Sequence, residues 1–176
     1  MSQKPRAEMI EQTRAKLIAS ARQAFASQGY GNTSMDDFTA QVGLTRGALY
    51  HHFGDKKGLL AAVVAQLDSE ADSRLDAISA DASDPWTGFQ QRCTAYLQMA
   101  QEPEIQQILL LDAPAVLGEL TLSLQLDCIA TLTRLLQQLI DEHYIPAFKP
   151  SKVFVEKIKN SKKIKIGAVV FLPKVQ

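Results

Sequence analysis

The sequence predicts an all-α protein, with a small amino-terminal domain of three helices and a larger helical domain behind it. Apolar residues recur at steps of three and four through most of the chain, which is the helical period. Glycine and proline fall at the ends of these patterns, where helices stop. Only the lysine-rich segment 149–176 departs from the helical period, so it is expected to be atypical.

The first helix is expected to run from about Glu8 to Ser27. One of its faces is apolar and carries Ile10, Leu17, Ile18, Ala21 and Phe25. Gly29 is expected to cap its carboxyl end, and Tyr30 to pack back on the last turn. This helix closes a three-helix domain that we assign to residues 1–55.

A second helix is predicted to begin after Ser34. Ser34 can cap it, and Asp37 stands three residues later, which is the spacing of a capping box. A small apolar set then follows that can pack two short helices together, namely Phe38, Val42, Leu44 and Leu49.

Gly43 falls where the second helix must stop, since glycine adopts the left-handed conformation of a helix end without steric cost. Thr45 can cap the third helix, which has Leu49 as its buried anchor. Its other residues offer donors, small side chains and an aromatic hydroxyl: Arg46, Gly47, Ala48, Tyr50, His51 and His52. Such a face suits the major groove of DNA better than a core. The segment 33–60 therefore predicts a helix-turn-helix.

These residues resemble the amino-terminal domain of the tetracycline-repressor (TetR) family of bacterial transcription regulators. The matching stretches are Gln28-Gly29-Tyr30, Thr33-Ser34, Val42-Gly43-Leu44-Thr45, Gly47-Ala48-Leu49-Tyr50-His51-His52-Phe53 and Asp55-Lys56. The resemblance covers about a third of the chain, and Lys57 departs from it where relatives commonly carry an acidic residue. It implies a homodimeric repressor that leaves a palindromic operator when a small-molecule effector binds.

The predicted DNA-binding residues follow from the helix-turn-helix and the resemblance: Ser34, Thr45, Arg46, Gly47, Ala48, Tyr50, His51, His52 and Lys56. By resemblance, Tyr50 contacts the phosphate backbone. Lys56 and Lys57 stand in the first turn of a helix, where cations oppose the macrodipole, so something should compensate. Lys56 is expected to meet a DNA phosphate, with a solvated lysine as the alternative. His51 and His52 point about 100° apart and are not expected to share a metal.

A long helix is predicted from Lys56 to about Ile78, with a break at Asp84-Pro85. It resembles the family's linker helix, which implies coupling between effector binding and the separation of two DNA-reading helices. Further helical patterns fill the rest of a second domain assigned to residues 56–148. They span residues 86–100, 105–111 and 122–140, with breaks at Pro103 and at Ala113-Pro114.

The effector pocket suggested by the resemblance could be lined by four large side chains: Trp86, Phe89, Tyr96 and Met99. The alternative is that this stripe is ordinary core. Residues 59–148 hold three Lys and Arg against thirteen Asp and Glu, a net charge of −10. A neutral or cationic apolar effector is therefore favoured over a multiply anionic one. The same acidic segment is repelled by DNA, whereas residues 1–58 carry +3.

Other function classes fit the sequence less well. The central region has no glycine-rich phosphate loop, metal-ligand spacing or evident nucleophile with its base, so a recombinase or nuclease is disfavoured and no cofactor or metal is expected. Cys93 and Cys128 are expected to be core thiols rather than a disulfide. No segment is long and apolar enough to span a membrane, which predicts a cytoplasmic protein.

The segment 149–176 carries eight lysines and one glutamate, with alternation at Lys163-Ile164-Lys165-Ile166. It does not resemble the two long terminal helices through which relatives dimerise. Three explanations are open: a strand or hairpin appendage, a basic tail that adds nonspecific DNA attraction, or a reading-frame change that replaced the original terminus, which we favour. Impaired dimerisation, with only weak nonspecific DNA affinity, is therefore an alternative to operator binding.

Overall fold

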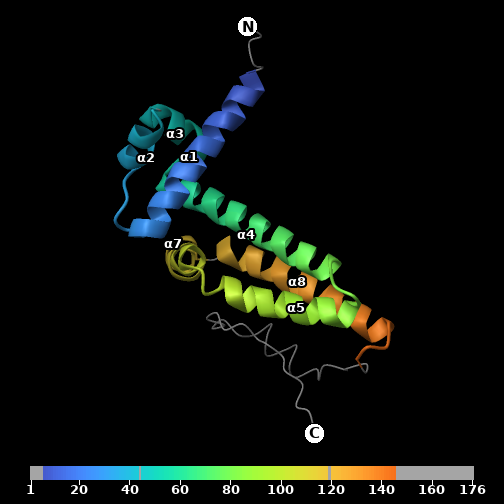
Figure 1. The fold of residues 1–176 in the computed structure, drawn as a ribbon. Helices are drawn as coiled ribbons and strands as arrows, with labels where there is room; N and C mark the ends of the chain where they lie inside the picture. Colours follow the sequence, from blue (N-terminus) through green and yellow to red (C-terminus); the bar gives the residue numbers. More distant parts are fainter. Residues whose placement is uncertain (1–5, 44, 119, 146–176) are drawn as a thin grey trace.

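A computed structural model describes residues 6–43, 45–118 and 120–145, and every regular element within these ranges is helical. The first three helices are α1 (Arg6–Gln28), α2 (Met35–Val42) and α3 (Arg46–Phe53). In Figure 1, α2 and α3 lie beside α1 at one end of the molecule. Fully buried side chains hold this domain together, among them Leu17, Phe25, Phe38, Leu49, Leu59 and Leu60.

The local signals for this domain are largely confirmed. α1 begins two residues before the predicted Glu8, and its end is closed by Gly29, whose φ is 76°. Tyr30 packs back on Phe25 with ring centroids 5.6 Å apart, as predicted. Gly43 follows α2 with a φ of 65°, the left-handed conformation that a side chain would strain.

A long helix, α4 (Lys56–Ala80), leads from this domain to the second one. It packs along α5 (Pro85–Met99), and α5 in turn contacts α8 (Leu120–Asp141); Figure 1 shows these three helices in the second domain. The predicted break at Asp84-Pro85 is confirmed. The Asp84 carboxylate accepts from the Thr87 backbone N–H at 3.0 Å, and proline occupies the first turn, where its missing N–H costs nothing.

The segment between α5 and α8 is where the predicted boundaries are wrong. It contains α6 (Pro103–Ile105), the π-helix η1 (Gln106–Asp112) and α7 (Ala113–Leu117) without a break between them. The helical path was expected to stop at Ala113-Pro114, but it passes through this pair. In the wide turn of η1, the Ala113 N–H bonds to Ile108 O. Pro114 then stands in the first turn of α7, where a missing backbone N–H costs no helical hydrogen bond.

Several predictions fall outside the described residues. They concern the segment 149–176, Leu44, and the side chains of Asp37 and Val42. The capping box with Ser34 therefore stays a prediction, although α2 does begin directly after Ser34. Within the described ranges, no helix combines the length and apolar character needed to cross a membrane.

Candidate functional site

The helix α3 is fixed at both ends and on one face. Thr45 caps it, and its hydroxyl accepts from the Ala48 N–H at 3.2 Å. Gly54 follows the last residue with a φ of 74°. Leu49 is fully buried and anchors the helix in the core shared by α1 and α4. The opposite face is therefore held in a defined orientation toward solvent.

That outer face carries the side chains predicted to meet DNA. Arg46, Gly47, Tyr50 and His51 are exposed, and their spacing places them on one side of the helix. The Arg46 guanidinium lies 5.9 Å from the centre of the Tyr50 ring, and its Nε is 3.4 Å from the Asp36 carboxylate on α2. An exposed ion pair of this kind contributes little to stability, so Arg46 can exchange it for a phosphate or a base edge.

Ala48 and His52 are less accessible than the other predicted contacts. Both are half-buried, and the His52 ring lies 5.4 Å from that of His51 and 6.0 Å from that of Phe53. In the described part of the chain, no group of three or more histidine, cysteine, aspartate or glutamate side chains lies close enough together to hold a metal ion.

Lys56 has partners that the sequence did not reveal. Its ammonium group donates to Tyr30 O and Thr33 O, both at 2.5 Å, and lies 4.2 Å from the centre of the Tyr30 ring. These contacts supply the compensation expected for a cation in the first turn of α4, beside the cap Asp55. The contact between Lys56 and a DNA phosphate stays a prediction. Lys57 is exposed, and Ser34 is exposed directly before α2.

The second domain contains a cavity of about 300 Å³ between the α4–α5 turn and the last turns of α8. Phe89, Leu135 and Leu139 give it apolar walls, while Ser83, Asp84 and Gln138 supply polar groups. This cavity is half open to solvent, so it would enclose a ligand only in part, and its volume lies at the lower limit of small-molecule sites.

The four side chains predicted to line an effector pocket are not brought together. Phe89 lines the cavity, and Trp86 stacks against it with ring centroids 6.3 Å apart. Tyr96 and Met99 lie two to three turns further along α5. Met99 is buried, whereas Tyr96 is 45% exposed. Of the four, only Phe89 lines this cavity, and the effector contacts stay a prediction.

A buried arginine of the second domain pairs with acidic side chains of α4. Arg92 on α5 is only 5% exposed, and it donates to the Asp76 carboxylate at 2.6 Å, with Asp72 at 3.8 Å. Burial, followed by the charges of nearby groups that include Asp68 and Asp72, raises the pKa of Tyr96. Burial also raises the pKa values of the Cys93 and Cys128 thiols, which were predicted to be core thiols and are free and half-buried.

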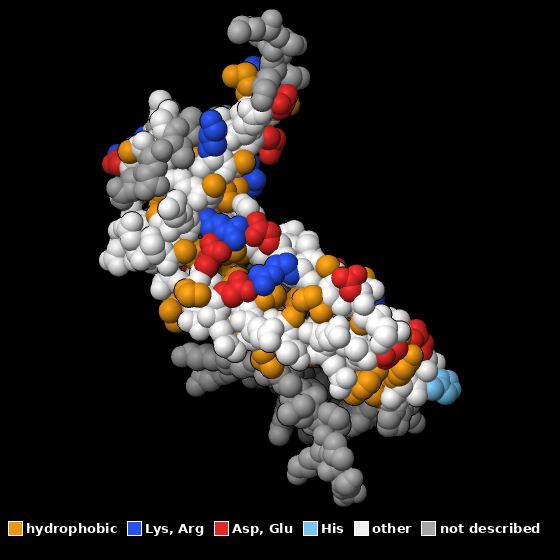
Figure 2. Space-filling model, in the orientation of Figure 1, with side chains coloured by type: hydrophobic (Ala, Val, Ile, Leu, Met, Phe, Trp, Pro, Cys, Tyr) orange, Lys and Arg blue, Asp and Glu red, His pale blue; other side chains and the backbone are white. Residues whose placement is uncertain are grey.

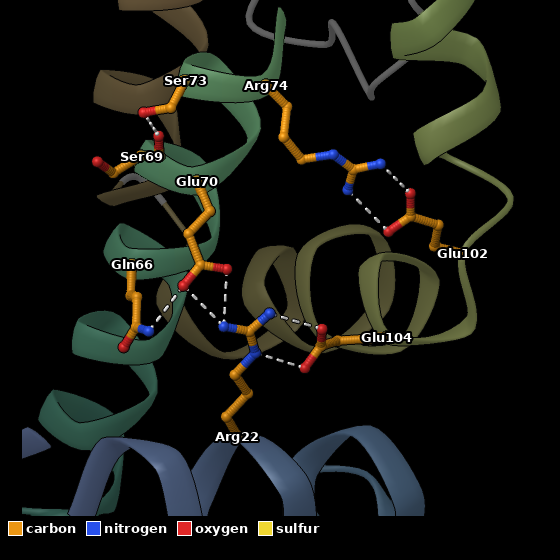
Figure 3. Close-up of polar contacts among 8 residues, drawn as sticks. All are labelled: Arg22, Gln66, Ser69, Glu70, Ser73, Arg74, Glu102 and Glu104. Carbon is orange, nitrogen blue, oxygen red and sulfur yellow. Dashed lines mark hydrogen bonds and ion pairs between the residues drawn. The ribbon is translucent and has the colours of Figure 1, made fainter. Parts of the chain in front are cut away.

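A polar cluster at the junction of the two domains was not found from the sequence. Figure 2 shows acidic and basic side chains gathered where the upper and lower parts of the molecule meet. Figure 3 shows Arg22 of α1 between Glu70 of α4 and Glu104 of α6, with Arg74 paired to Glu102 nearby. No local pattern marks these residues, because Arg22 and Glu104 are 82 positions apart in the chain.

Comparison with protein families gives two matches. A model of bacterial regulatory proteins of the tetR family matches residues 17–63. A model of a tetracyclin repressor-like C-terminal domain matches residues 86–153. Together they cover the second half of α1, the whole helix-turn-helix, the beginning of α4, and the second domain from α5 onward.

Known proteins agree with these matches. The chain is 40% identical over 65 residues to the HTH-type transcriptional regulator SrpR of Pseudomonas putida, an alignment covering 37% of this chain and 30% of SrpR. The regulator TtgR of the same species is 37% identical over 65 residues, covering 37% of this chain and 31% of TtgR. The aligned part thus spans about a third of the length of these curated relatives.

Solved structures extend the similarity over more of the chain. A TetR-family transcriptional regulator of Pectobacterium atrosepticum superposes with a TM-score of 0.71 and 60% identity, covering 79% of this chain and 72% of that one. The fatty acid degradation regulator FadR of Bacillus halodurans superposes with a TM-score of 0.67 at 14% identity, covering 90% of this chain and 80% of FadR. At that identity, the second similarity concerns the fold alone.

Proposed function

Because the chain belongs to the tetracycline-repressor (TetR) family of bacterial regulatory proteins, we propose that it is a cytoplasmic, DNA-binding repressor of transcription. Two copies read a near-palindromic operator, each through its own α3, and a small-molecule effector releases them. The curated relatives are matched over about a third of their length, so these activities are proposed for this chain rather than transferred to it.

The observation that carries the DNA-binding proposal is the outer face of α3. Leu49 fixes the helix from behind, and the exposed Arg46, Tyr50 and His51 then form a polar surface of the size that enters a major groove. Arg46 is suited to a base edge or a phosphate, and Tyr50 to the phosphate backbone. Ser34 at the start of α2 and Lys56 at the start of α4 flank this surface as backbone contacts.

The cavity beside Phe89 supports an effector site in the second domain. Two arginines of this domain, Arg74 and Arg92, are already paired with Glu102 and with Asp76. They are therefore poorly available to an anionic ligand. Burying an anion among the many acidic side chains of this domain would carry a large cost in free energy. We propose a small apolar effector that is neutral or carries a positive charge.

The test is selection of random genomic fragments by the full-length protein near physiological salt, followed by sequencing. Enrichment of one near-palindromic site is expected. Arg46→Ala should reduce affinity for that site about tenfold or more, the order for one specific contact. Tyr50→Phe, which removes only a hydroxyl, should reduce it less. Arg134→Ala is the matched control, because Arg134 is also exposed but lies on α8, and it should retain full affinity.

Other results would identify the alternatives. Uniform retention of all fragments that disappears with added salt would indicate charge-driven binding by a chain with impaired dimerisation. A monomeric mass at micromolar concentration would support the same conclusion, since one half-site offers about half the contacts. Metal-dependent cleavage of the retained DNA would instead indicate a DNA-processing enzyme.

The effector proposal has a separate test. Thermal unfolding of the protein is followed with a panel of small apolar compounds that differ only in charge. Neutral and cationic members should raise the melting temperature and release the selected DNA, because they bind the native second domain. Phe89→Ala should weaken both effects, and Leu97→Ala, an exposed apolar position on the same helix, should not. Preference for the anionic members would contradict the proposed chemistry.

A further inference from the structure

The segment from α6 to η1 reaches into the DNA-binding domain through two carboxylates. The first is Glu104, whose two oxygens accept from Nε and Nη2 of Arg22 at 2.7 and 2.9 Å. The remaining nitrogen of the same guanidinium, Nη1, donates to both oxygens of Glu70 at 2.8 and 2.9 Å. Figure 3 shows this arrangement, in which one arginine of α1 joins α4 and α6. Such paired bonds fix direction as well as distance.

The second carboxylate is Asp112 at the end of η1. It accepts from the backbone N–H of Tyr30 at 2.8 Å, in the loop between α1 and α2. The carbonyl of the same residue accepts from Lys56, which also binds Thr33 O. The loop that leads into α2 is thus held from one side by the second domain and from the other by the start of α4.

Apolar packing makes this contact stiff. Ile105, Ile108 and Leu117 belong to the same buried cluster as Leu17, Phe25 and Phe38 of the DNA-binding domain. Segments that share one close-packed core can change their relative position only by repacking into a few distinct states, not by small gradual shifts. A shift of the segment 103–117 would therefore be expected to shift α1 and the loop before α2 with it.

We propose that Glu104 and Asp112 are positioning residues that set the orientation of the helix-turn-helix relative to the second domain, and thereby the half-site spacing that the dimer accepts. This inference rests on the proposed function, because a spacing exists only where two copies bind one operator. Neither residue is expected to contact DNA. Each acts through Arg22 or Tyr30 on α1 and α2.

The experiment uses the full-length protein and the operator found by selection, remade with the two half-sites moved apart or together by one and two base pairs. For the wild-type protein, affinity should be greatest at the natural spacing. In Asp112→Ala and Glu104→Ala, the preference for natural over altered spacing should fall about threefold or more, the order expected for residues that couple two sites. Asp112→Asn keeps an acceptor oxygen and should restore much of the preference.

Glu102→Ala is the matched control. It removes a carboxylate from the same region, but Glu102 pairs with Arg74 of α4, and no side-chain hydrogen bond or ion pair among the described residues joins it to α1 or to the loop before α2. Its spacing preference should equal that of the wild-type protein. Melting temperatures separate positioning from damage, since a merely destabilised variant loses affinity equally at every spacing and regains it on cooling.

The outcomes are distinct. An unchanged spacing preference in folded Asp112→Ala and Glu104→Ala, with an operator that the wild-type protein does bind, would overturn the positioning role alone. A uniform loss at all spacings would also overturn it, because that is the result of a purely structural role. Failure of the wild-type protein to select any paired site would overturn the proposed function, and this inference with it.

Discussion

At the scale of single residues, Lys56 shows how an unfavourable position becomes useful. A cation in the first turn of a helix opposes the macrodipole. Two carbonyl oxygens and the face of Tyr30 offset that cost, and in return the ammonium group ties the loop before α2 to the start of α4. Whether it binds the loop, as observed, or a DNA phosphate, as predicted, Lys56 keeps a positive charge close to the end of α3.

The two thiols give a prediction about pH. Burial raises the pKa values of Cys93 and Cys128, so fewer of them are ionised at a given pH than in an unfolded chain. Alkylation by iodoacetamide should therefore be slow near neutral pH, and its midpoint should lie above that of an ordinary thiol, roughly 8.5. The readout is peptide mass spectrometry of samples labelled from neutral to alkaline pH.

The raised pKa values of the two thiols also make the stability of the protein depend on pH. The unfolded thiols ionise first, so the free energy of unfolding should fall as the pH rises past their ordinary pKa and level off above the raised one. Protein labelled in denaturant serves as the control and should show the ordinary midpoint. A native midpoint equal to the denatured one would contradict the burial of these groups.

At the scale of elements, α3 is short, and its stability depends on its ends and its anchor. An isolated helix of eight residues would not persist in water, so Thr45, Gly54 and Leu49 determine whether it forms. Gly43 does the same for the turn before it. Thr45, Leu49 and Gly43 were recognisable in the sequence, since each acts on its immediate neighbours or at helical spacing, whereas the role of Gly54 was found only in the structure.

Thr45→Ala tests this dependence. Loss of the hydroxyl that accepts from the Ala48 N–H should lower the free energy of unfolding by about 1 kcal/mol, the usual cost of losing a helix cap. Denaturant unfolding measures it. Thr133→Ala, an exposed position inside α8 whose hydroxyl bonds only to its own helix, is the control and should be nearly neutral. Equal stability of Thr45→Ala and the wild-type protein would refute the capping role.

The segment between α5 and α8 could not be predicted from its local sequence. Proline at position 114 predicted a stop, as it does in an ordinary α-helix. A π-helical turn precedes it and changes which carbonyl each N–H meets, so the helical path continues to Leu117. The buried contacts of Ile105 and Ile108 with the DNA-binding domain hold this unusual turn in place, and no local signal announces it.

At the scale of the whole molecule, charge is divided along the chain. Residues 1–58 carry +3, residues 59–148 carry −10 and residues 149–176 carry +7, so DNA should be attracted to the two ends of the chain and repelled by its middle. The arrangement in Figure 1, with α1 to α3 at one end of α4 and the acidic helices along the rest of it, turns this sequence asymmetry into a spatial one.

The salt dependence of DNA binding tests whether this division of charge matters. The logarithm of the DNA association constant should fall linearly with the logarithm of salt concentration, with a slope of about −0.9 for each phosphate contacted. Lys57→Gln, which removes an exposed cation at the start of α4, should reduce the slope by about that amount. Arg134→Gln removes an exposed cation on the distant α8 and should not. Equal slopes for the two variants would mean that total charge, not its position, governs binding.

The sequence by itself determined the helical class, the helix-turn-helix with its caps and anchor, the break at Asp84-Pro85 and the family resemblance. All of these depend on interactions between near neighbours, which the order of residues specifies directly. Only the tertiary structure decided which turn of α5 faces the cavity, that Lys56 binds the loop, and that Glu104 and Asp112 reach Arg22 and Tyr30. The last two contacts each join residues 82 positions apart, and such pairs are set by how whole helices pack.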